Sequence, residues 1–139
     1  MINVYATCVS LNGKGILLLG KTGSGKSDLA LRLIEQTGAI LVADDRTDLQ
    51  IKNNEITACC PNKIKGLLEV RGIGIIKKKY RQKAKIHLVV ELVENRQEVD
   101  RLPEEDFWEF EKIKVRKIKL YPFDASTPYK IKTACDEIR

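Results

Sequence analysis

The residues with the clearest chemical potential lie in one stretch, positions 20–27. They are Gly20, Lys21, Thr22, Gly23, Ser24, Gly25, Lys26 and Ser27, the pattern G-x-x-x-x-G-K-S of a phosphate-binding loop. Glycines let successive backbone N–H groups turn toward one phosphate without steric clash. In such loops the lysine contacts the β- and γ-phosphate oxygens, and the hydroxyl after it binds magnesium. We therefore predict a nucleoside triphosphate site with Mg²⁺, in which Lys26 holds phosphate oxygens and Ser27 binds the metal.

The segments on either side of the loop have the patterns needed to position it. The apolar run 15–19 predicts a buried strand, and residues 28–35 place apolar side chains at helical spacing before a stop at Gly38. The start of a helix adds unpaired N–H groups and a positive dipole end. A glycine-rich turn without a ligand is the alternative, and the agreement of strand, loop and helix disfavours it.

A pair of acidic residues follows the next strand of the chain. Residues 39–43 are apolar and are followed by Asp44 and Asp45. Sites in open α/β sheets form at the carboxyl ends of strands, so we expect both carboxylates to face the phosphates. The chain lacks the arginine-rich lid of small-nucleotide kinases and the N-K-x-D run of GTPases. The pattern therefore predicts an atypical P-loop protein.

Composition limits the class of protein. The 139 residues, 43% hydrophobic and 32% charged, fit one globular domain over residues 1–139. No apolar run is long enough to span a bilayer, and the first residues lack the basic start of a signal peptide. Four cysteines without a C-x-x-C pair favour a reducing compartment over a disulfide framework or a zinc site. We expect a cytoplasmic protein that does not associate with membranes.

The net charge of +6 is concentrated in one segment. Residues 77–85 carry six Lys and Arg and no acid, which equals the excess of 25 basic over 19 acidic residues in the whole chain. This basic segment is either a docking surface for an acidic partner or a solvated loop, and the sequence leaves both open. Few aromatic residues interleave with it, so nucleic-acid binding is not expected.

The rest of the chain consists mainly of predicted strands, and two of its segments have a further feature. The segment from Asp106 to Phe110 contains three of the four Phe and Trp residues of the chain and is interpreted as core or as a packing lid. The alternation in 113–120 slips at Arg116 and Lys117, which predicts a β-bulge. The other expected elements are strands at 3–9, 86–93, 113–115 and 118–120, a hairpin of 49–51 with 56–58, a helical turn at 64–68 and a helix at 129–138.

Four stretches together resemble the catalytic domain of bacterial HPr kinase/phosphorylase. They are residues 20–27, 41–45 (L-V-A-D-D), 68–76 (L-E-V-R-G-I-G-I-I) and 100–102 (D-R-L). The resemblance extends from about Val4 to Leu120, and the compact length is similar to the short alphaproteobacterial forms. It implies an α/β fold, a P-loop NTPase-like mixed β-sheet with flanking helices of the HPr kinase/PEP carboxykinase type.

The resemblance also implies an activity and roles for named residues. The reaction would be ATP-dependent phosphorylation of a serine on an HPr-type phosphocarrier protein, by a homo-oligomer that requires Mg²⁺. By position, Asp45 would be the general base, Asp44 would support it and the metal, and Glu69 would be a second acid beside the metal. Arg101 would stabilise the transferring charge. Phosphoryl transfer depends mainly on positioning and charge neutralisation, which such a set can supply.

Three departures from the family pattern affect the expected activity. Tyr5 stands where the family has a catalytic histidine, and a phenol does not shuttle protons at neutral pH as an imidazole does. Residues 121–125 replace an arginine-glycine loop tied to the reverse reaction, in which phosphate releases pyrophosphate. The basic segment replaces a glycine-rich mobile one. We expect kinase rather than phosphorylase activity, with a catalytically degenerate ATP-binding regulator as the alternative; a small-molecule kinase is disfavoured.

Overall fold

Two long strands, β1 (Ile2–Leu11) and β8 (Lys83–Leu92), organise the fold and each belongs to two sheets. The structure, a computed structural model, describes residues 1–138. The remaining elements are β2 (Lys14–Leu19), α1 (Lys26–Thr37), β3 (Ile40–Ala43), β4 (Arg46–Lys52), β5 (Glu55–Cys59), β6 (Leu67–Val70), β7 (Gly74–Lys77), β9 (Asp106–Phe110), β10 (Ile113–Leu120) and α2 (Thr127–Glu137), with 3₁₀ turns at Asn62–Ile64 and Arg96–Glu98.

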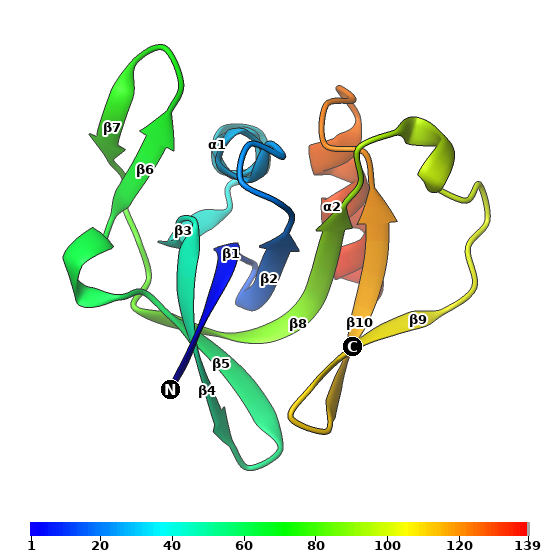
Figure 1. The fold of residues 1–139 in the computed structure, drawn as a ribbon, viewed down its shortest axis with the longest axis horizontal. Coiled ribbons are helices and arrows are strands. Elements are labelled where there is room, and N and C mark those ends of the chain that lie inside the picture. Colours follow the sequence, from blue (N-terminus) through cyan, green and yellow to red (C-terminus); the bar gives the residue numbers. More distant parts are fainter. Residues whose placement is uncertain (139) are drawn as a thin grey trace.

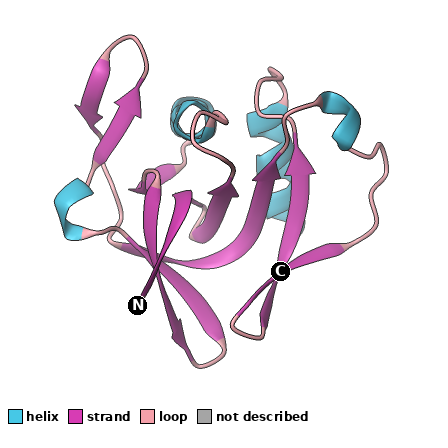
Figure 2. Ribbon diagram, viewed as in Figure 1, coloured by secondary structure: helices cyan, strands magenta, loops and turns pink. Residues whose placement is uncertain are grey.

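The pairing changes partway along each of the long strands. The first residues of β1 pair with β4, and the rest pair with β2 on one side and β3 on the other. Likewise β8 begins beside β5 and continues between β2 and β10. Figure 2 shows the resulting curvature, with the β4–β5 hairpin splayed away from the main sheet. The second half of β1 therefore lies beside both β2 and the end of β3, where the predicted site residues begin.

The main sheet is mixed, as predicted. Strands β2, β8 and β10 are parallel to one another, whereas β1, β3 and β9 run antiparallel to their neighbours. The carboxyl ends of β2, β8 and β10 thus meet at one end of the sheet, together with the start of α1 and the loop before α2 (Figure 1). This is the end at which ligands bind in open α/β sheets.

Two clusters of buried side chains cover the two faces of the main sheet. The first core cluster joins α1 and α2 to one face, and includes Leu29, Leu33 and Ile131. The second core cluster fills the space between the two sheets. Trp108 and Phe110 pack against the second core cluster, stacked on each other at 5.2 Å between ring centroids. The prediction that 106–110 serves packing is therefore confirmed for Trp108 and Phe110, whereas Phe107 is exposed.

The helix after the glycine-rich loop begins and ends close to the predicted positions. It starts at Lys26, two residues earlier than expected, and its C-cap is Gly38 in the left-handed region at φ 78°. The N–H of Gly38 donates to the carbonyl oxygen of Leu33, which closes the last turn. In the described part of the chain, no helix has the length and apolar character needed to cross a membrane.

Two local predictions are wrong. The expected helical turn at 64–68 is a 3₁₀ turn that ends at Ile64, and Leu67 and Leu68 instead begin the β6–β7 hairpin. The expected bulge at Arg116 and Lys117 is absent, because β10 pairs without a register shift on both sides. The alternation slips for another reason: Ile113 and Val115 face the second core cluster, whereas Ile118 and Leu120 face the first. A regular strand whose buried side chains switch from one face of the sheet to the other gives the same hydrophobic pattern in the sequence as a bulge.

The first prediction concerns the packing of α1 on the sheet. Replacing Leu33, which is fully buried in the first core cluster, by alanine removes transfer free energy and leaves a cavity. We expect the free energy of unfolding to fall by about 2–5 kcal/mol, measured by urea denaturation. Gln36→Ala on the exposed side of the same helix is the control and should change it by less than about 0.5 kcal/mol. Equal effects of the two substitutions would contradict this packing.

Candidate functional site

The loop formed by residues 20–27 is shaped by its glycines. Gly25 lies at the N-cap of α1 with φ 100°, and Gly23 has φ 83°. A Cβ on Gly25 would lie 2.9 Å from ring atoms of Phe123, and one on Gly20 would lie 2.3 Å from Oγ of Ser24. Both the backbone conformation and the close approach therefore require glycine at position 25. The loop is compact, and the first residue of α1, Lys26, extends its side chain back toward Gly20 of the loop.

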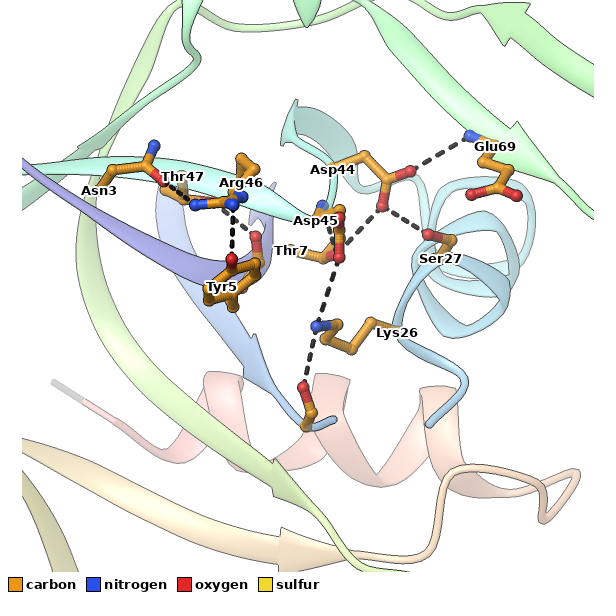
Figure 3. A network of polar contacts seen from close by, with 12 residues as sticks. Asn3, Tyr5, Thr7, Lys26, Ser27, Asp44, Asp45, Arg46, Thr47 and Glu69 are labelled. Atoms are coloured by element: carbon orange, nitrogen blue, oxygen red, sulfur yellow. Dashed lines mark hydrogen bonds and ion pairs between the residues drawn. The ribbon is translucent and has the colours of Figure 1, made fainter. Parts of the chain in front are cut away.

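Lys26 is the buried cation of the site. Its side chain is 5% exposed, and Nζ donates to the carbonyl oxygen of Gly20 at 2.8 Å. The same nitrogen lies 3.6 Å from Oδ1 of Asp45 (Figure 3). A buried ammonium is stable only when it is paired and hydrogen-bonded, and Lys26 has one carboxylate and one carbonyl oxygen for its three donors. It can therefore donate to one more anionic oxygen.

Ser24 supplies the second observation that suits a phosphate. Its Oγ is buried inside the loop and has no hydrogen-bond partner among the described residues. An unpaired buried hydroxyl is unfavourable, and such groups in native proteins commonly point to a missing ligand or ion. Together with Lys26 and the helix start, it forms a concave donor set for an anion. The residues present thus fit the triphosphate that the sequence predicts.

Asp44 links three elements through one buried carboxylate. Its Oδ1 accepts from Oγ of Ser27 at 2.6 Å and from Oγ1 of Thr7 at 3.0 Å, and its Oδ2 accepts from the backbone N–H of Glu69 at 3.1 Å (Figure 3). These donors belong to α1, β1 and β6. Because the Ser27 hydroxyl donates a hydrogen bond to Asp44, the lone pairs of the Ser27 oxygen stay available for a cation.

Asp45 occupies a strained turn between β3 and β4. The N–H of Arg46 donates to the carbonyl oxygen of Asp44 at 2.7 Å, an i to i+2 bond with Asp45 at φ 65° between them. Such positive-φ γ-turns are rare and strained, and they persist only when neighbouring groups hold them. Thr7 does so, because its Oγ1 accepts from the N–H of Asp45 at 3.0 Å. The carboxylate of Asp45 stays 54% exposed beside Lys26.

Thr7 is a site residue that sequence reasoning missed. It is fully buried on β1, donates to Asp44 and accepts from Asp45. A threonine in a predicted strand is ordinary, since β-branched residues favour strands, and so nothing in the local sequence distinguishes it. Only the pairing of β1 with β3 reveals its role.

Glu69 reaches the site through its backbone. Its N–H donates to Asp44, and its side chain is exposed on β6, where Glu69 pairs with Ile75 of β7. Within residues 1–138, no group of three or more His, Cys, Asp and Glu side chains is arranged to hold a metal ion. A magnesium ion would therefore depend on few protein ligands, as is usual when phosphate oxygens complete its coordination.

Arg101 and Tyr5 are not brought to Lys26. Arg101 is exposed in the loop that leads to β9, and no hydrogen bond or ion pair of the described residues connects it to the loop of residues 20–27. Tyr5 is exposed on β1, where its hydroxyl accepts from Nη2 of Arg46 at 2.6 Å and the guanidinium carbon lies 3.7 Å from the ring centroid. Tyr5 is therefore engaged with Arg46, the residue that follows Asp45 in the chain (Figure 3).

The basic segment, residues 77–85, does not form one uniform surface. Lys78 pairs with Glu35 of α1 at 2.6 Å, and Lys85 pairs with Glu55 of β5 at 3.1 Å. Lys77, Lys79, Arg81 and Lys83 are exposed and form no ion pair with any described residue. The two interpretations of this segment, docking surface and solvated loop, thus concern mainly these four residues.

Comparison with known proteins relates this site to one family. Residues 1–127 match the model of the HPr serine kinase C-terminal domain. The chain is 40% identical to an HPr kinase/phosphorylase of Cupriavidus necator over 111 residues, 73% of this chain and 34% of that protein. A similarly named protein of Leptothrix cholodnii is 40% identical over 116 residues, 76% of this chain and 35% of that protein. The chain thus spans about a third of the length of these curated relatives.

The fold also matches a solved structure. The Hpr(Ser) kinase/phosphatase from Coxiella burnetii superposes with a TM-score of 0.85 at 27% sequence identity, covering 98% of this chain and 89% of that one. The mixed sheet with its flanking helices is therefore the fold of that protein. The fold class implied by the resemblance is confirmed.

The second prediction concerns Thr7. In Thr7→Val the shape is kept, but the N–H of Asp45 loses its partner and Asp44 loses one donor. We expect the free energy of unfolding to fall by about 1–3 kcal/mol, measured by urea denaturation. The control is Thr57→Val on β5, whose hydroxyl makes no hydrogen bond to a described residue, and it should be near neutral. A Thr7→Val protein as stable as the control would contradict the role given to Thr7.

Proposed function

The chain belongs to the HPr serine kinase C-terminal domain family, and we propose that it is an ATP-dependent kinase for a serine of an HPr-type phosphocarrier protein. The observation that carries the proposal is the convergence of Lys26, Asp44 and Asp45 at one end of the sheet. Because the match covers only 34% of the relative from Cupriavidus necator, the activity of such relatives comes to this chain only as part of this proposal.

The loop of residues 20–27 would bind the triphosphate of ATP. Its backbone N–H groups and the buried Lys26 ammonium would neutralise phosphate oxygens, and the orphan hydroxyl of Ser24 would donate to one of them. Ser27 and Asp44 would hold Mg²⁺, with Glu69 of the β6–β7 hairpin close to them. When bound, the ion would neutralise charge on the β- and γ-phosphates.

Asp45 would act as the general base. Its exposed carboxylate can receive the proton of an incoming serine hydroxyl while Lys26 orients it from 3.6 Å. The serine oxygen bonds to the γ-phosphorus, the bond from that phosphorus to the β,γ-bridging oxygen breaks, and ADP leaves. Most of the acceleration would come from holding the reactants in line and from charge neutralisation.

Arg101 stays a proposed charge-stabilising residue. Its exposed loop would have to move, or a second copy of the chain would have to supply the residue, which would agree with the expected homo-oligomer. A cytoplasmic location and the absence of nucleic acid and membrane partners are parts of the same proposal. We propose kinase rather than phosphorylase activity because residues 121–125 differ from the family's arginine-glycine loop.

Tyr5 supports a second candidate function. Its hydroxyl and ring are both engaged with Arg46, so no histidine-like proton shuttle stands beside Asp45. A protein of this kind could bind Mg²⁺ and ATP as a regulator without transferring phosphate. The two candidates differ only in turnover.

The third prediction separates the candidates. Label from γ-³²P ATP with Mg²⁺ should appear on the serine of a purified HPr-type carrier with the unmodified chain. In Asp45→Asn the loss of the base should lower the rate about 10²–10⁴-fold, while affinity for ATP changes little. Glu55→Gln, a charge change of the same kind away from the site, is the control. ATP binding without any transfer by the unmodified chain would favour the regulator.

The fourth prediction tests docking by the basic segment. Because Lys78 is already paired, the change is the double variant Lys77→Glu with Lys79→Glu. We expect KM for the carrier to rise about tenfold with kcat nearly unchanged, since complementary charge mainly steers association. The double variant Lys112→Glu with Lys114→Glu changes net charge equally, in the β9–β10 turn and at the start of β10, and serves as control. An unchanged KM, or an equal rise in the control, would identify the segment as a solvated loop.

A further inference from the structure

A shallow cavity of about 430 Å³ lies between the two helices beside the phosphate-binding loop. Its walls come from one face of α1, from the loop after β10 and from the first turns of α2. The lining residues are Asp28, Arg32, Gln36, Phe123, Ala125 and Tyr129. The loop residues belong to the segment that departs from the family pattern. None of the roles proposed above uses this cavity.

The cavity adjoins the loop of residues 20–27, where the phosphates would bind. The ring of Phe123 closes on Gly25, the N-cap of α1, and Asp28 stands one turn into that helix. A triphosphate bound at the start of α1 must place its ribose and base beside the loop that holds it. This cavity is a hollow that directly adjoins that loop and has aromatic walls.

The aromatic walls are fixed before any ligand arrives. Arg32 donates from Nε to Asp28 at 3.0 Å and from Nη1 to the carbonyl oxygen of Asp124 at 3.2 Å, and it also donates to the carbonyl oxygen of Pro122. These bonds join α1 to the loop on both sides of Phe123. Tyr121 packs edge-on against Phe123, with ring centroids 5.7 Å apart. Little ordering cost would therefore accompany binding.

Two rings remain open within this fixed frame. Phe123 is 56% exposed and Tyr129 is 52% exposed, although both lie in a cavity wall. Aromatic faces that are rigid and solvent-exposed suit a planar ligand, because every base has a π-face to stack on them. The polar groups of Asp28 and Arg32 are already paired with each other, so the recognition would come from stacking rather than from hydrogen bonds.

We propose that this cavity is the nucleoside subsite, in which the purine base of the bound nucleotide stacks on Phe123 and Tyr129. The inference rests on the proposed function, because it needs the phosphates at residues 20–27. It adds the part of the nucleotide that the phosphate-binding motif does not specify. A base held there is fixed relative to Gly25, and so the triphosphate is fixed relative to Lys26.

The test compares two ligands that share the phosphates and differ in the base. Isothermal titration calorimetry with Mg²⁺ measures the Kd of ATP and of inorganic tripolyphosphate. For Phe123→Ala and for Tyr129→Ala we expect the Kd of ATP to rise about tenfold, because base–aromatic stacking has that magnitude, and the Kd of tripolyphosphate to stay within about twofold. Phe123→Trp should keep the affinity for ATP. Phe107→Ala, at an exposed aromatic of β9, is the matched control and should change neither.

The outcomes separate this inference from the proposed function. If the unmodified chain binds neither ligand, the proposed function fails. If it binds both and the alanine variants leave ATP affinity unchanged, the phosphate site stands and the nucleoside subsite is overturned. An equal loss for both ligands in Phe123→Ala would also overturn it, since Phe123 would then only support the loop. Unchanged binding by Tyr129→Ala alone would restrict stacking to Phe123 and overturn the two-ring form proposed.

Discussion

The carboxylate of Asp44 is the interaction on which the rest of the site depends. Buried carboxylates are unfavourable unless donors satisfy them, and Asp44 has three, from α1, β1 and β6. Each bond draws a different element to the end of β3. The start of α1 is thereby held so that Lys26 meets Asp45, and the β6–β7 hairpin is held so that Glu69 lies beside Ser27. A single charge thus sets the geometry of groups that are up to about sixty residues apart.

The curvature of the sheet makes that convergence possible. Because β1 passes from one sheet into the other, its second half borders both β2 and β3, and Thr7 arrives between the phosphate-binding loop and the acidic turn. The turn itself is strained at Asp45 and is held by Thr7. Strain stored at a site and held by buried hydrogen bonds keeps a side chain in a defined place without a ligand. The exposed carboxylate of Asp45 is therefore preorganised.

The chain combines features typical of its family with local replacements that lie around the site rather than inside it. Tyr5 is paired with Arg46 at one border, and Phe123 packs on Gly25 at another. In the sequence, the loop of residues 20–27 and the acidic pair between these borders resemble the family pattern. We therefore expect this chain to differ from its relatives in acceptor, nucleotide affinity or turnover mainly through the surroundings of these residues.

The sequence by itself determined the elements whose signals are local. Three elements follow from periodicity and from the backbone preference of glycine: the apolar run before Gly20, the helix that stops at Gly38 and the strand just before Asp44. Only the tertiary structure decided what depends on pairing between distant segments. It identified Thr7 as a support of the acidic turn, separated Arg101 from the phosphate-binding loop, and showed β10 to be regular where its alternation suggested a bulge. A hydrogen bond from β1 to β3, or a strand that changes its covered face, has no local pattern, because its partners meet only after the chain has folded.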